Sequence, residues 1–90
     1  MEPARVASAK TRADHEAIAR AYEDTAVTLE KEANVHAQLA KTYGDYHAPK
    51  LYSEDMERRC KELEKDLKVS ADLNRKLAAI HRKIAAELNN

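Results

Sequence analysis

Residues suited to a protein core recur at alternating steps of three and four along two stretches of this chain, and a single break separates the stretches. In an α-helix this spacing places every such residue on one face. The pattern predicts a helix over residues 11–43 and a second over 53–88, each roughly 50 Å long at 1.5 Å rise per residue. The first face comprises His15, Ile18, Tyr22, Ala26, Leu29, Ala33, His36, Ala40 and Tyr43, and the second comprises Met56, Cys60, Leu63, Leu67, Ser70 with Ala71, Asn74, Leu77, His81, Ile84 and Leu88.

Local signals mark the ends of both predicted helices. Thr11 and Asp14 are spaced as a capping box, in which side-chain oxygens bind free amides at a helix start. Gly44 is expected to end the first helix in the left-handed conformation, and Ser53 is expected to cap the second. Residues 1–10 lack the periodicity and are expected to fray, and 44–52 form a loop.

The composition fits an all-α protein. One glycine, two prolines and no tryptophan or phenylalanine are typical of long helices rather than of a sheet. Sixteen basic and sixteen acidic side chains cancel to a net charge of +0, so no charge excess points to nucleic acid or an anionic membrane. No apolar run approaches the roughly 20 residues that a membrane span needs. The single cysteine cannot form an intrachain disulfide.

The short loop predicts that residues 1–90 form one domain, a long antiparallel helical hairpin. Two helices alone leave one flank of each apolar face in water. We therefore expect two chains to pair into a four-helix bundle, a homodimer in which the isolated monomer is weakly folded.

Four polar residues on the two inward faces are candidate metal ligands: His15, His36, Cys60 and His81. The fourth histidine, His47, falls in the loop and is expected to be solvated. In an antiparallel hairpin, facing residues share one index sum, which is 96 for His36 with Cys60 and also for His15 with His81. Two unrelated pairs therefore agree on one register, with one pair near the loop and the other near the chain ends.

Antiparallel packing of two such hairpins would bring the pairs together. His36 and Cys60 of one chain would share a layer with His15 and His81 of its partner, which gives two equivalent sites of one thiolate and three imidazoles. Parallel packing would instead give four imidazoles at one end, and two thiols with two imidazoles at the other. The antiparallel arrangement is favoured because its sites are complete and equivalent.

Copper is the expected metal, with zinc as the alternative. Two His and one Cys with a weaker fourth ligand form the copper electron-transfer pattern, and the Irving–Williams order favours copper over zinc at the same donors. A site with four protein ligands leaves no position for substrate, so no enzymatic activity is expected. The other interpretation is a metal-free dimeric interaction module, in which each imidazole bonds to a glutamate or a carbonyl and Cys60 is a small core residue.

Three short motifs resemble small bacterial helical-hairpin proteins, often exported, that dimerise into four-helix bundles. They are ADHEA over residues 13–17, Cys60 with Leu63, and AIHR over 79–82. The resemblance implies a periplasmic setting and copper handling or electron transfer, with one Cys and three His per site.

Overall fold

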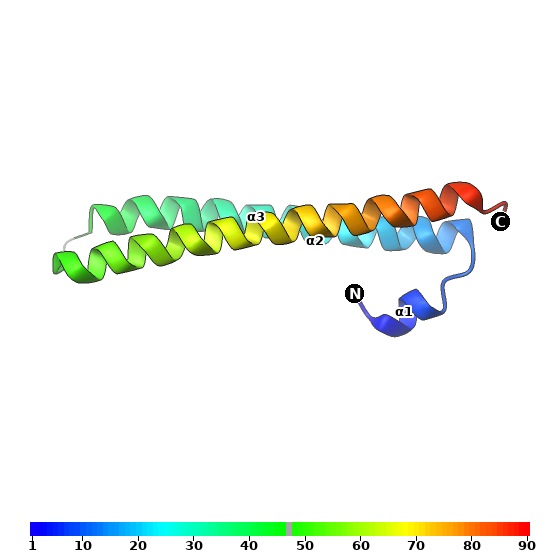
Figure 1. Ribbon diagram of the computed structural model, residues 1–90, viewed down its shortest axis with the longest axis horizontal. Helices are drawn as coiled ribbons and strands as arrows, with labels where there is room; N and C mark the ends of the chain where they lie inside the picture. Colours follow the sequence, from blue (N-terminus) through cyan, green and yellow to red (C-terminus); the bar gives the residue numbers. More distant parts are fainter. Residues whose placement is uncertain (47) are drawn as a thin grey trace. The chain divides into compact units, whose positions relative to one another are not determined.

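Three helices make up the computed structural model, which describes residues 1–46 and 48–90 (Figure 1). They are α1 (Pro3–Ala7), α2 (Arg12–Gly44) and α3 (Lys50–Glu87), and the described residues contain no strand. The predicted all-α class and the packing of two long helices as a hairpin are confirmed. None of the helices in the described part is both long and apolar enough to cross a membrane.

Contacts divide the chain into two compact units, and each contains a length of α2 and a length of α3. The first unit combines Met1–Val27 with Ala71–Asn90, and the second is Thr28–Ser70. The pair His15 and His81 therefore lies in the first unit, and the pair His36 and Cys60 lies in the second.

Alanine dominates the buried interface between the helices. Seven alanines are buried, and they recur at heptad spacing on each helix: Ala19, Ala26, Ala33 and Ala40 of α2, and Ala71, Ala78 and Ala85 of α3. A methyl side chain leaves little volume between two helices, so dispersion contacts between closely approaching backbones supply much of the stability. Each alanine removes little apolar surface from water, so the hairpin gains less from burial than a leucine core would.

The larger residues of the predicted faces lie beside this alanine row. Tyr22 and Leu29 are half-buried, whereas Leu63 and Leu77 are 45% and 42% exposed. The inner faces therefore centre on the alanines, and one flank of α3 stays open, as expected for a hairpin of two helices.

The capping box at the start of α2 is confirmed. The Asp14 amide donates to Thr11 Oγ1 at 3.1 Å, and the Asp14 carboxylate accepts the amides of Thr11 and Lys10 at 3.1 and 3.0 Å. These backbone hydrogen bonds lower the pKa of the Asp14 carboxyl, because they favour its ionised form.

Two other predictions about helix ends are wrong. Ser53 does not cap α3, which begins at Lys50: the Pro49 carbonyl accepts the Ser53 amide at 3.3 Å, and Ser53 Oγ donates to the Lys50 carbonyl at 3.1 Å. Proline starts a helix well, because its missing amide hydrogen is not needed there. Gly44 does not adopt the left-handed conformation and is instead the last residue of α2.

Gly44 instead allows a side chain of α3 to approach closely. A Cβ at this position would lie 3.1 Å from Glu57 Oε2, the far end of a flexible side chain. We expect Gly44→Ala to raise the unfolding free energy by about 0.5 kcal/mol, because alanine is the better helix former and the carboxylate can rotate away. Urea unfolding measures the change, and a loss of stability would show that the Glu57 position is fixed.

Residues 1–10, expected to fray, contain helix α1. None of the α1 residues is buried, and the segment borders an open hollow of about 220 Å³ lined by Arg5, Ser8, Ala9, Asp14, Ala17 and Ile18. Ile18 is only 1% exposed. The N-terminal segment therefore lies near the flank of α2 that carries Ile18.

Candidate metal site

The first unit brings two predicted ligands into direct contact. His15 Nδ1 of α2 lies 3.0 Å from His81 Nδ1 of α3, and the two rings stack with their centroids 5.2 Å apart. This contact confirms the predicted register for the pair. An ion pair between Glu23 and Arg82, with Nε and Oε2 3.3 Å apart, joins the same two lengths of helix.

The surroundings of this pair restrict the movement of His81. His81 is 9% exposed, whereas His15 is half-buried. The ring of Tyr22, which lies one heptad beyond His15, stacks on the His81 ring with the two centroids 5.9 Å apart. This role of Tyr22 was not predicted from the sequence, although its spacing of one heptad from His15 places it on the same helix face.

Two imidazole nitrogens that lie 3.0 Å apart must share a hydrogen atom or bind a common ion. In the metal-free protein one Nδ1 must carry the hydrogen and the other must accept it. Two imidazole nitrogens bound to one tetrahedral metal at 2.0–2.1 Å lie about 3.3 Å apart. The observed separation of 3.0 Å is close to this value.

The same contact makes the metal-free protein sensitive to pH. Burial lowers the pKa of His81, and the nearby charge of His15 lowers it further. The folded protein therefore resists protonation of His81 at a pH where the unfolded chain, with a pKa of about 6.5, accepts the proton.

We expect the unfolding free energy to fall between pH 7.5 and pH 5.5, and to level off below the folded pKa of His81. Urea unfolding with a chelator present measures this slope, and His81→Phe should make it much shallower. The lowered pKa values of Asp14, Glu23 and Asp55 affect stability only below about pH 5, outside this interval. Equal slopes for the two proteins would exclude His81 as the cause.

The second unit holds the other two predicted ligands. Cys60 of α3 is a free, buried cysteine at 8% exposure. His36 of α2 is half-buried, and its Nδ1 is buried without a hydrogen-bond partner in the described part of the chain. A buried nitrogen without a partner is costly, so the folded protein gains if a proton donor or a metal binds it. The direct facing of His36 and Cys60 stays a prediction.

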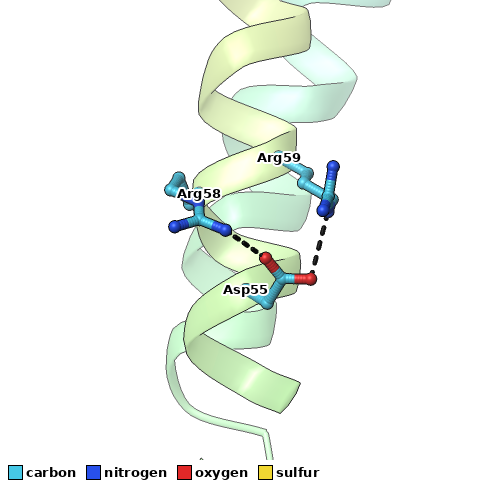
Figure 2. A network of polar contacts seen from close by, with 3 residues as sticks. All are labelled: Asp55, Arg58 and Arg59. Atoms are coloured by element: carbon cyan, nitrogen blue, oxygen red, sulfur yellow. Dashed lines mark hydrogen bonds and ion pairs between the residues drawn. The ribbon is translucent and has the colours of Figure 1, made fainter. Parts of the chain in front are cut away.

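Charged side chains occupy the outer surface of α3 beside Cys60. Figure 2 shows the Asp55 carboxylate between the guanidinium groups of Arg58 and Arg59, with Arg59 Nε at 3.0 Å. All three project from the first turns of α3, and both arginines are exposed. These ion pairs keep the arginines on the outer surface, while the thiol of the next residue is buried.

The metal-free interpretation expects each imidazole to bond to a glutamate or a carbonyl. At Nδ1, His15 and His81 bond to each other instead, and His36 has no partner among the described residues. Nearby acids pair within their own helix, as Glu16 does with Arg12 and Glu64 with Lys68.

The described residues of one chain do not bring a complete set of metal ligands together. Among the described residues, no group of three or more His, Cys, Asp or Glu side chains lies close enough to hold a metal ion. Each unit supplies two of the four predicted ligands, and His47 lies outside the described residues. Comparisons with protein-family models, with curated proteins and with solved structures found no match to this chain.

Proposed function

We propose that this chain is a copper-binding protein that works as an antiparallel homodimer with two sites. Each site takes His36 and Cys60 from one chain, and His15 and His81 from its partner. The observation that carries this proposal is the 3.0 Å approach of His15 Nδ1 to His81 Nδ1, which places two nitrogen donors beside each other.

The dimer follows from the number of donors that each chain offers. A four-coordinate site needs four ligands, and each unit contributes two. Antiparallel packing adds the buried thiol and the unpartnered imidazole of the second unit to the imidazole pair of the first. It thereby also gives His36 Nδ1 a partner, which it lacks among the described residues of one chain.

Copper fits this donor set better than zinc. Three imidazoles and a single thiolate bind copper more tightly than zinc, in line with the Irving–Williams order. The imidazoles and the thiolate can serve both Cu(I) and Cu(II), so the site suits electron transfer or the binding and delivery of copper. Four protein ligands leave no open position for a substrate, which argues against catalysis. A zinc ion at the same ligands would instead be structural and hold the two chains of the dimer together.

Titration of the chelator-treated protein with Cu(II), followed by absorption spectroscopy, tests the proposal. We expect intense thiolate-to-copper bands that saturate at about one copper per chain and that are lost in Cys60→Ala. The matched control is His47→Ala, which removes a histidine outside the ligand set and should leave the bands unchanged.

The absence of these bands, together with an unchanged melting temperature, would refute metal binding. The protein would then be the metal-free interaction module. If zinc instead binds at the same stoichiometry without such bands, the proposed ligand set would stand and the metal would be zinc rather than copper.

A further inference from the structure

The His81 ring of α3 lies between two aromatic rings of α2. Its centroid is 5.2 Å from that of His15 and 5.9 Å from that of Tyr22, and the interplanar angle is 22° in both contacts. His15 and Tyr22 are one heptad apart, which separates them by about 10.5 Å along the helix. A ring that stacks on both of them must therefore lie between them.

The direction of helical side chains explains why these rings meet. Side chains of an α-helix lean toward its N-terminus, and the two helices of a hairpin run in opposite directions. Tyr22 therefore leans along α2 toward the level of His15, and His81 leans along α3 toward the level of Tyr22. Because His81 faces His15 in the register of the hairpin, its ring enters the space between the two rings of α2.

The neighbours of His81 on its own helix offer the ring little restraint. The buried residues one turn before and after it are Ala78 and Ala85, which are 1% and 2% exposed. The terminal torsion of a histidine side chain is broad, and methyl groups do not select one orientation. A stacked aromatic ring does, because it keeps the two planes nearly parallel. His15 is itself a proposed ligand, so Tyr22 supplies the restraint that does not depend on the metal.

We infer that Tyr22 is the positioning residue of the histidine pair: its ring holds the plane of His81 so that the two Nδ1 atoms of the pair face each other. This inference deepens the proposed function and rests on it for the role in metal binding. The contact also fixes the tautomer of His81, because the hydrogen bond at one ring nitrogen decides which nitrogen carries the hydrogen. The shell of residues that orients a metal ligand changes the metal affinity without touching the metal.

Nuclear magnetic resonance of the nitrogen-15-labelled, chelator-treated protein tests the positioning without a metal. At about pH 7.5 the imidazoles are neutral, and the shifts of the two His81 ring nitrogens show which of them carries the hydrogen. We expect a single tautomer in the unmodified protein and in Tyr22→Phe, which keeps the ring. In Tyr22→Leu the His81 ring should exchange between tautomers, so its two nitrogen shifts should move toward a common value.

Tyr43→Leu is the matched control. Tyr43 also lies on α2, one heptad beyond a proposed histidine ligand, but its ring contacts Tyr46 in the second unit. The control should leave the single tautomer of His81 unchanged. Circular dichroism checks the helical content of each variant. If Tyr22→Leu does not fold, Tyr22→Met takes its place, because a flexible methionine adapts to the space that the ring leaves.

Titration with Cu(II) measures the consequence for the metal. We expect Tyr22→Leu to bind about one copper per chain with a dissociation constant that is roughly tenfold higher than that of the unmodified protein. Tyr22→Phe should bind copper as the unmodified protein does, because the stacked ring is retained.

The outcomes separate this inference from the proposed function. A single His81 tautomer in Tyr22→Leu, its loss in Tyr22→Phe, or an equal loss in Tyr43→Leu would overturn the positioning role of the Tyr22 ring. Equal copper affinity of Tyr22→Leu and the unmodified protein would refute its role in metal binding, while copper binding itself would stand. If none of these proteins binds copper, the proposed function fails, and the tautomer of His81 alone decides whether Tyr22 orients the pair.

Discussion

Replacing Ala26 with leucine should destabilise the protein by about 3 kcal/mol, at the upper end of the cost of overpacking a core. Ala26 is 0% exposed, and Ala71 on the facing length of α3 is also buried. The two helices approach closely because both rows consist of methyl side chains. A leucine has no empty volume to enter, so it must separate the helices and remove the contacts of neighbouring alanines.

Urea unfolding followed by circular dichroism measures this loss. The matched control is Ala79→Leu, which adds the same side chain at an exposed position next to the buried Ala78. It should change the unfolding free energy by less than about 0.5 kcal/mol. If Ala26→Leu and Ala79→Leu unfold alike, the alanine row is not the closely packed interface.

Spacing in the sequence was sufficient to predict the two long helices and the facing of His15 with His81. Steps of three and four require a helix face, and an antiparallel hairpin admits one index sum, which the contact of His15 with His81 confirms. The capping box at Thr11 was predictable because it depends only on residues three apart.

The exact centre of each inner face was not predictable from the apolar pattern. Ala19 and Ile18 are neighbours in sequence and both buried, yet only Ile18 lines the hollow beside the N-terminal segment. A pattern of apolar residues does not say which of two adjacent flanks meets which helix. The roles of Gly44 and Ser53 were predicted wrongly for a related reason. Residues that are common in turns also occur inside helices and at points where a neighbouring helix approaches closely, and only the packing of that helix distinguishes these roles.

The candidate site was predictable as a set of donors but not as a geometry. Histidine and cysteine on an inward face can be recognised as metal donors from their residue type alone. The stacking of Tyr22 on His81, in contrast, depends on side-chain rotamers that the spacing does not fix. The proposed four-ligand layer also takes atoms from two chains, which the facing of residues within one hairpin does not describe.

The second large effect is expected from metal binding. A ligand that binds only the folded dimer stabilises it by RT ln(1 + [L]/Kd), which is about 4 kcal/mol per site at a free metal concentration one thousand times the Kd. Chelator-treated protein should therefore unfold at a much lower urea concentration than protein supplied with copper. The midpoint should also depend on protein concentration, because dissociation of the dimer accompanies unfolding.

His81→Phe isolates the contribution of the ligand from that of packing. Phenylalanine keeps an aromatic ring beside Tyr22 and removes the nitrogen that faces His15. Burial already disfavours the charged form of His81. The substitution should therefore change the free energy of unfolding of the chelator-treated protein by less than about 1 kcal/mol at pH 7.5. The stabilisation by metal, in contrast, should fall by most of its roughly 4 kcal/mol, because each proposed site loses one of its four donors. If His81→Phe retains the full stabilisation, the metal binds elsewhere on the chain. If it lowers the stability of the chelator-treated protein by several kcal/mol, the histidine pair serves the packing of the hairpin rather than a metal.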